Sequence, residues 1–333
     1  MTNRFSTLGL GLLMIATACG GDATEDTPAA AAVTMPEDQA VRTADPYARG
    51  YSDDDFPRVQ ELAPDVYSYE QLRSAGDEKF TTVSLFVVTD DGVLVADGQG
   101  SVDETALMIE HIGEITDRPI TTVVVASDHG DHTAGNSAFP EDAAFLAHPT
   151  SAAALEAMAA NTRDGAPAVR LATELVPDRK VIEMGGKEIQ VLFLGRAHTG
   201  GDLVVYLPAE KIMFMSEAYL HRVFPAMRTA YPSEWVDMIE AAQAMDVDVY
   251  VPGHGFVDHP SILDAELELY QGAIRVVIDE ARRLYEEGYG LEDAQSLAQF
   301  GDLEEWTLRS SQGDRALQQV YAEFDGELGG AGR

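Results

Sequence analysis

The chain has 333 residues, of which 45% are apolar and 24% are charged, and these fractions exclude a fully disordered or fibrous protein. Its 57 acidic residues far exceed its 22 basic ones, so the formal net charge is −35. Such a charge repels nucleic-acid phosphates and anionic lipid head groups, and we therefore expect no nucleic acid as partner. The composition leaves the oligomeric state open.

Residues 1–18 have the pattern of a signal peptide: Arg4 precedes a short apolar run, which ends in the small-residue segment 16–18. Cys19, the only cysteine, follows directly. This pattern resembles a bacterial lipoprotein signal, in which that cysteine is lipidated; a plain secretory signal is the alternative. Either predicts an exported protein, periplasmic or at the cell surface, and the first adds membrane contact through the N-terminal lipid alone.

Residues 19–55 are rich in Ala, Thr, Asp, Glu and Pro and have no sustained apolar period. We predict a disordered tether there. Apolar patterns begin after it, and they predict a folded core over residues 56–260 and a helical C-terminal segment, packed on the core, over 261–333.

Within the core, alternating and helical apolar periods predict a series of elements. In chain order these are a strand at 66–69, a hairpin over 83–96 with an Asp-Gly turn, a helix at 103–115, strands at 121–125 and 144–147, a helix at 151–160, hairpins over 181–194 and 203–215, a helix at 235–244, a strand at 248–251, and helices beyond 260 with a break near 288–290. A strand, a crossover helix and a second strand indicate a layered α/β fold.

Histidines with glycine or acidic neighbours follow closely after several of these strands. They lie in the segments Ser127–His132, Ala197–Asp202 and Pro252–Gly255. Loops at strand ends are where α/β folds place their functional sites. Imidazole and carboxylate ligands suit Zn²⁺, so the three segments predict a zinc site.

At this point the chain resembles the metallo-β-lactamase superfamily, whose first motif is His-x-His-x-Asp-His after a strand. Ser127 stands at the first histidine of that motif, and His129, Asp131 and His132 fill the other three positions. The later family ligands match His198 and His254, and Glu217 takes the place of the bridging acid, which is usually Asp. The resemblance covers about residues 60–260.

The resemblance implies an α/β fold, specifically a four-layer αβ/βα sandwich, here with a helical C-terminal extension. It also implies one or two Zn²⁺ ions in the cleft between the sheets. One ion would be held by His129, His198 and Glu217, with Ser127 as a possible weak ligand. The other would be held by Asp131, His132, His254 and Glu217.

Zinc can lower the pKa of a bound water from 15.7 to about 7 and so supply hydroxide at neutral pH, which Asp131 would orient as the catalytic residue. The expected function is a zinc hydrolase acting on a small ester, lactone, β-lactam or thioester. Two alternatives remain: a sulfate- or phosphate-ester hydrolase of the same fold, and a non-catalytic binding lipoprotein with a degenerate metal site. Four residues near Glu217 are further expected to line the substrate pocket: Tyr219, His221, Arg222 and Tyr231.

Overall fold

The computed structural model describes residues 42–163 and 165–329. The predicted signal peptide, Cys19 and the tether up to residue 41 lie outside the described residues. Within the described residues, no helix combines the length and the apolar character that crossing a membrane requires.

In the part of the chain that the structure describes, twelve strands form one sheet, which is made of two halves. The first half contains β1 (Arg58–Ala63), β2 (Val66–Ala75), β3 (Glu78–Thr89), β4 (Gly92–Ala96), β5 (Ile120–Val125), β6 (Ala144–Ala147) and β7 (Glu174–Leu175). The second contains β8 (Arg179–Met184), β9 (Lys187–Leu192), β10 (Val204–Leu207), β11 (Ile212–Leu220) and β12 (Val249–His254).

The strand order is β7-β6-β5-β4-β3-β12-β11-β10-β9-β8, with β2 on β3 and β1 on β2. Strands β4 to β7 are parallel, as are β11 and β12, and the remaining pairs are antiparallel. The two halves join where β3 meets β12, in a register with one residue pair, Thr82 opposite His254. The strand and hairpin predictions are confirmed.

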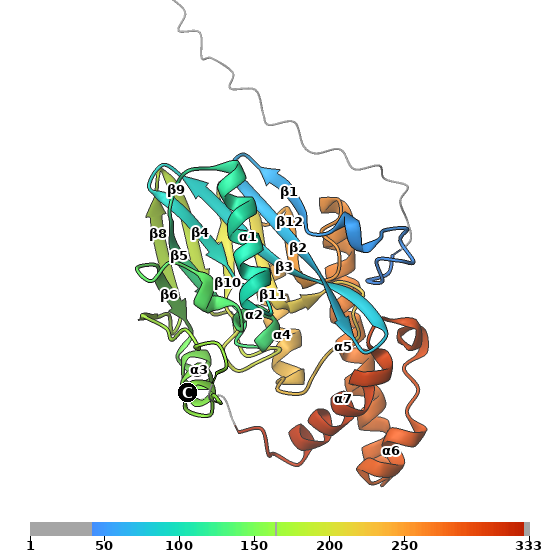
Figure 1. Ribbon diagram of the computed structural model, residues 1–333. Helices are drawn as coiled ribbons and strands as arrows, with labels where there is room; N and C mark the ends of the chain where they lie inside the picture. The colour runs from blue at the N-terminus through green and yellow to red at the C-terminus, as the bar shows by residue number, and fades with distance from the viewer. Residues whose placement is uncertain (1–41, 164, 330–333) are drawn as a thin grey trace, which may run out of the picture. The chain divides into compact units, whose positions relative to one another are not determined.

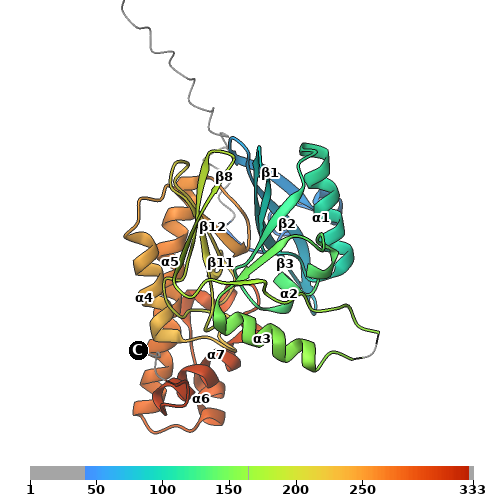
Figure 2. The ribbon, with the colours of Figure 1, turned by 90° about the vertical axis from the view of Figure 1, so that its left-hand side faces the viewer.

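Helices cover both faces of the strands, and Figure 2 shows α1 on one side with α4 and α5 on the other. The helices are α1 (Val102–Ile115), α2 (Gly130–Thr133), α3 (Pro149–Ala160), α4 (Pro232–Gln243), α5 (Pro260–Glu286), α6 (Leu291–Leu297) and α7 (Arg309–Phe324), with 3₁₀ turns η1 (Asp53–Asp55), η2 (Asn136–Ala138) and η3 (Gly301–Glu305). The apolar side of α1, with Met108 and Ile112, packs on Phe86, Val95 and Val123 of the sheet. The larger core lies between the halves and beneath α4 and α5. The predicted four-layer sandwich is confirmed.

The C-terminal extension folds against α5, and α7 lies beside it (Figure 1). Ala316, Leu317 and Val320 of α7 are fully buried. Leu308, just before α7, has a left-handed backbone with φ 68°, and its N–H donates to Glu78 Oε1 at 2.7 Å. The start of α7 is therefore fixed to the start of β3.

The prediction of a tether over residues 19–55 is wrong for residues 42–55. Ala44 is fully buried, and Arg49 forms a two-pronged ion pair with Asp258, at 2.6 and 2.9 Å. The ring of Tyr51 stacks on Phe256 with centroids 5.2 Å apart. Composition alone did not reveal these anchors, because their partners lie some 200 positions later in the chain.

Candidate metal centre

The histidine segments meet at one end of the sheet, where β5, β11 and β12 end. His129, Asp131 and His132 follow β5 in and around the short helix α2, while Glu217 lies in β11 and His254 ends β12. Ser216 has a left-handed backbone, φ 48°, which shifts the register of β11 against β12 just before Glu217. Gly253 is required beside it, since a Cβ there would overlap the Ser216 carbonyl and lie 2.7 Å from Glu217 N.

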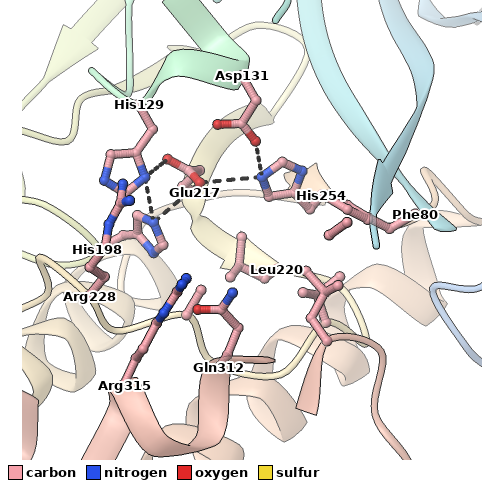
Figure 3. Close-up of a pocket in the computed structure, with 14 residues that line it drawn as sticks. Phe80, His129, Asp131, His198, Glu217, Leu220, Arg228, His254, Gln312 and Arg315 are labelled. Atoms are coloured by element: carbon pink, nitrogen blue, oxygen red, sulfur yellow. Dashed lines mark hydrogen bonds and ion pairs between the residues drawn. The ribbon is translucent and has the colours of Figure 1, made fainter. Parts of the chain in front are cut away.

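Three of the predicted ligands form a first cluster. His129 Nδ1 lies 2.9 Å from Glu217 Oε2, and His198 Nε2 lies 3.2 Å from Glu217 Oε1. The two ring nitrogens are 3.0 Å apart. Figure 3 marks these contacts with dashed lines. The donor atoms of the three residues converge closely enough to hold one metal ion.

A second cluster shares Glu217 with the first. His254 Nε2 lies 3.2 Å from Asp131 Oδ2 and 3.3 Å from Glu217 Oε1. His132 Nε2 lies 3.4 Å from His254 Nε2. Together, Asp131, His132, Glu217 and His254 form a four-donor set.

The outer contacts of His254 and His132 favour one neutral tautomer of each ring. His254 Nδ1 donates to the Thr81 carbonyl oxygen at 2.9 Å, and His132 Nδ1 lies 3.1 Å from Asp97 Oδ2. In the neutral rings with the proton on each Nδ1, both Nε2 atoms present lone pairs to each other. Either a proton on one Nε2 or a metal ion bound to both relieves their repulsion, so this donor set fits a divalent metal.

Thr229 favours the other tautomer for His129, in which the proton is on Nε2. The Thr229 hydroxyl donates to the His198 carbonyl oxygen at 3.2 Å, and it can therefore accept from His129 Nε2–H at 2.9 Å. In the neutral ring the His129 Nδ1 lone pair is then directed at Glu217 and His198, and in the protonated ring Nδ1 donates to Glu217. The first cluster thus also fits a metal, with three donors.

Proton binding competes with metal binding in both clusters. Burial alone would lower the pKa of His129, but the charge and hydrogen bond of Glu217 raise it to about 9. Burial opposes protonation of His254 as well, yet its hydrogen bonds to Asp131 and Glu217 raise its pKa to about 10. Burial favours the neutral acid of Glu217, but the charges of His129 and His198 hold its pKa well below the usual range. Glu217 is therefore an ionised, shared acceptor.

Ser127 is fully buried, and its hydroxyl donates to Glu217 Oε2 at 2.5 Å. Asp97, also buried, accepts from Ala126 N at 2.7 Å and from Ser216 Oγ at 2.5 Å, and so ties the β5 and β11 ends together. Asp97 and Thr229 support the site but were not predictable from the sequence, because neither belongs to a histidine segment.

A cavity of about 190 Å³ opens beside the clusters. It is lined by Ala75, Phe80, His129, Asp131, His198, Glu217, Leu220, Val223, Ala226, Arg228, His254, Leu308, Gln312 and Arg315. Arg228, Gln312 and Arg315 were likewise not predictable from the sequence. The last two lie on α7, where nothing in the local pattern indicated contact with the site.

The four residues expected to line the pocket do not line this cavity, so that expectation is corrected. Tyr219 is fully buried with its hydroxyl on the Leu263 carbonyl, and His221 Nδ1 faces the Phe256 carbonyl at 2.8 Å. Arg222 pairs with Glu266, and the ring of Tyr231 lies under the guanidinium of Arg196. Each has a partner in the fold away from the cavity.

Comparison with known proteins places these features in a family. Residues 77–254, more than half of the chain, match the model of the metallo-beta-lactamase superfamily. A curated relative, the metallo-beta-lactamase type 2 of Bacillus sp. (strain 170), is 23% identical over 216 residues, which are 63% of this chain and 81% of the relative. Another, the 2,4-dinitroanisole O-demethylase subunit alpha of Nocardioides sp. (strain JS1661), is 26% identical over 168 residues, 50% of this chain. The match spans about half, 49%, of that subunit's length.

Solved structures share the fold. A metallo-beta-lactamase from Pontibacter korlensis aligns with a TM-score of 0.56 at 21% identity, covering 64% of this chain and 98% of its own. A stereoselective inverting sec-alkylsulfatase from Pseudomonas sp. aligns with a TM-score of 0.61 at 14% identity, covering 80% of this chain and 50% of its own. The fold and the convergent donor set agree with the family match. This chain belongs to the metallo-β-lactamase superfamily, because the family model matches more than half of it.

Proposed function

We propose that this chain is an exported zinc-dependent hydrolase that cleaves a small ester, lactone, β-lactam or thioester. The observation that supports the proposal most is the convergence of two ring nitrogens, His132 Nε2 and His254 Nε2 at 3.4 Å, beside two carboxylates. The names of the relatives cover several reactions, and the fold hosts many chemistries. The reaction type therefore rests on the donor set.

In this proposal His129, His198 and Glu217 hold one zinc, and Asp131, His132, His254 and Glu217 hold the other. Zinc, when bound, would lower the pKa of a water and polarise the bond under attack. The outer partners Thr81, Asp97 and Thr229 keep the ring nitrogens in the tautomers that such ligands need. Because the set with Asp131 has four donors and the set with His129 has three, we expect one zinc to bind tightly and the other more weakly.

Asp131 is the proposed catalytic residue, and its side chain is 28% exposed toward the cavity. Burial and the charge of Glu217 would raise its pKa, but the hydrogen bond with His254 and the charge of His132 hold it below its usual range. An ionised carboxylate only accepts hydrogen bonds. Asp131 can therefore orient a water in the cavity through that water's proton.

The proposed location is the periplasm or the cell surface, with a lipid on Cys19 as the only membrane attachment. It is supported by the signal-like residues 1–18 and by the position of the lone cysteine directly after them.

The test uses the mature chain, with metal removed by chelator and returned as zinc. Zinc per chain and turnover are measured on a 4-nitrophenyl ester, a lactone, a β-lactam and a thioester. We expect at least one tightly bound zinc, and hydrolysis that chelator abolishes and zinc restores. Asp131→Asn should lose most turnover, whereas Asp128→Asn, a neighbouring carboxylate outside both clusters, should keep its zinc content.

Hydrolysis that persists at full rate in chelator would contradict the proposal. Binding of less than one zinc per chain would favour the alternative of a non-catalytic lipoprotein with a degenerate site.

A further inference from the structure

The cavity beside the metal centre has one cationic wall. Arg228 lies in the loop after β11, and Arg315 lies on α7 with Gln312 one turn before it. Figure 3 shows Gln312 and Arg315 pointing from α7 toward the histidine cluster. Both arginines are exposed and line the cavity.

These two cations differ from most of their kind in this acidic chain. Most of the described arginines pair with a carboxylate, among them Arg42, Arg73, Arg196, Arg222 and Arg275. Among residues 42–163 and 165–329, no carboxylate lies within ion-pair distance of Arg228 or Arg315, although the net charge is −35. Two guanidinium groups that remain charged at any physiological pH thus face one small cavity without an anionic partner among these described residues.

The two segments that carry these arginines are bound to each other. Gln319 of α7 donates to the Ala230 carbonyl oxygen at 2.7 Å, two positions after Arg228. Phe224 N donates to the Thr307 carbonyl oxygen at 2.9 Å, just before α7 begins. The backbones that present Arg228 and Arg315 are therefore held in place before any ligand arrives, which lowers the cost of binding one.

Another part of the cavity lining is apolar. Phe80 lies edge-on to the ring of His254, with centroids 5.2 Å apart, and Leu220, Val223 and Leu308 continue this surface. A ligand that fits both walls carries an anionic group and an apolar portion. Guanidinium forks match planar or tetrahedral oxyanions with paired hydrogen bonds.

We propose that Arg228 and Arg315 form an oxyanion subsite, which selects substrates that carry a carboxylate, sulfate or phosphate group beside an apolar portion. This inference rests on the proposed hydrolase function and names its substrate class. The oxyanion is either a remote carboxylate or the sulfate or phosphate of the bond that is cleaved.

Two esters of equal chain length and leaving group test the subsite: mono-4-nitrophenyl adipate, which carries a carboxylate, and 4-nitrophenyl hexanoate, which does not. For the zinc-loaded wild type we expect a lower KM for the adipate. Arg315→Ala and Arg228→Ala should each raise the ratio of the KM for the adipate to the KM for the hexanoate by roughly tenfold, because each removes a charge-assisted hydrogen bond to the carboxylate. Arg315→Lys should fall between.

Arg179→Ala is the matched control, because Arg179 is an exposed arginine of β8 that is not part of the cavity. It removes the same charge, and the KM ratio of the two esters should stay at the wild-type value. An equal KM effect of the Arg315 and Arg228 substitutions on both esters would overturn the subsite. Turnover of 4-nitrophenyl sulfate or phosphate with the same sensitivity to Arg315→Ala would place the oxyanion on the cleaved bond.

A second measurement separates this inference from the hydrolase proposal. Sodium sulfate, compared with sodium chloride at equal ionic strength, should raise the Tm of the metal-free wild type and of Arg179→Ala, and should raise that of Arg315→Ala and Arg228→Ala less. If no ester is hydrolysed but this difference is found, the hydrolase proposal fails and the subsite stands. If the sulfate effect is the same in all four proteins, the subsite is overturned whatever the esters show.

Discussion

Ser127 donates a hydrogen bond from Oγ to Oε2 of Glu217 at 2.5 Å, in the motif position where the superfamily has its first histidine. The serine therefore supports the shared carboxylate instead of adding a fourth donor to the first cluster. The Ser127 hydroxyl also accepts from His129 N at 3.3 Å, so it links two residues of the first cluster.

Ser127→Ala should consequently weaken the first zinc more than the second. Loss of a partner that orients a metal ligand lowers affinity by roughly 10- to 100-fold. A two-site zinc titration of the wild type and the variant measures both constants. Equal losses at the two sites, or none, would remove the supporting role assigned to Ser127.

Glu217→Gln should reduce zinc binding at both clusters and cut turnover, because a neutral amide is a poorer ligand and leaves the histidine charges unbalanced. Glu217→Asp keeps the carboxylate and should be milder. Zinc stoichiometry and hydrolysis are measured for the three proteins. Unchanged zinc content in Glu217→Gln would show that Glu217 is not a ligand.

The stability of the metal-free protein should fall at alkaline pH. The pKa values of His129 and His254 rise from 6.5 to about 9 and about 10 in the folded chain. A raised pKa means that the proton stabilises the fold, so this stabilisation is complete below pH 6.5 and is lost as pH rises through 9 and 10. Thermal unfolding in chelator, scanned from pH 6 to 10.5, should show the loss.

Zinc should reverse that trend, since it binds the neutral imidazoles and displaces their protons. Zinc affinity should therefore increase with pH over the same range, and the zinc-loaded protein should keep its Tm where the metal-free protein loses it. Parallel Tm curves with and without zinc would contradict the assignment of these two histidines as ligands.

Gly253→Ala should destabilise the fold by about 3 kcal/mol, the upper end for overpacking, because the new Cβ meets the rigid backbone of Ser216 and Glu217. Zinc affinity should fall with it, since Glu217 must shift. Gly272→Ala on α5 is the control: its Cβ has no atom within 4 Å, and the helix gains about 0.5–1 kcal/mol. Urea unfolding and a zinc titration compare both variants with the wild type.

Cys19→Ala should release the exported protein from the membrane into the soluble fraction if the cysteine carries lipid. Zinc content of the released variant should equal that of the wild type, because no residue of either donor set changes. Fractionation of cells that produce each form provides the measurement. A variant that remains bound to membranes would contradict the lipid anchor.

Spacing and residue type singled out the histidine segments, because each lies at or soon after the end of a strand with a clear apolar pattern. The four-layer sandwich, the role of Glu217 and the division of the ligands into two donor sets came from the resemblance to the metallo-β-lactamase superfamily. The pocket was not predictable in the same way. Every residue of β11 up to Leu220 is buried, so Tyr219 is part of the core, and its nearness to Glu217 in sequence was misleading. Arg315 reaches the cavity only through the packing of α7 on α5, and no local pattern specifies that contact.

His132 and His254 are 122 positions apart, and they meet at the seam where β3 and β12 share one residue pair. Three of the six donors lie in the part of the chain that carries β1 to β7, and three lie in the part that carries β8 to β12, so neither part alone offers a complete set. Contacts this distant in sequence carry a loop-closure cost, and each donor set is complete only once the two parts have come together. For an exported chain, as proposed, the metal would then be captured in the compartment where the chain folds and not where it is made, and the zinc supply outside the cytoplasm would set how much of the protein becomes active.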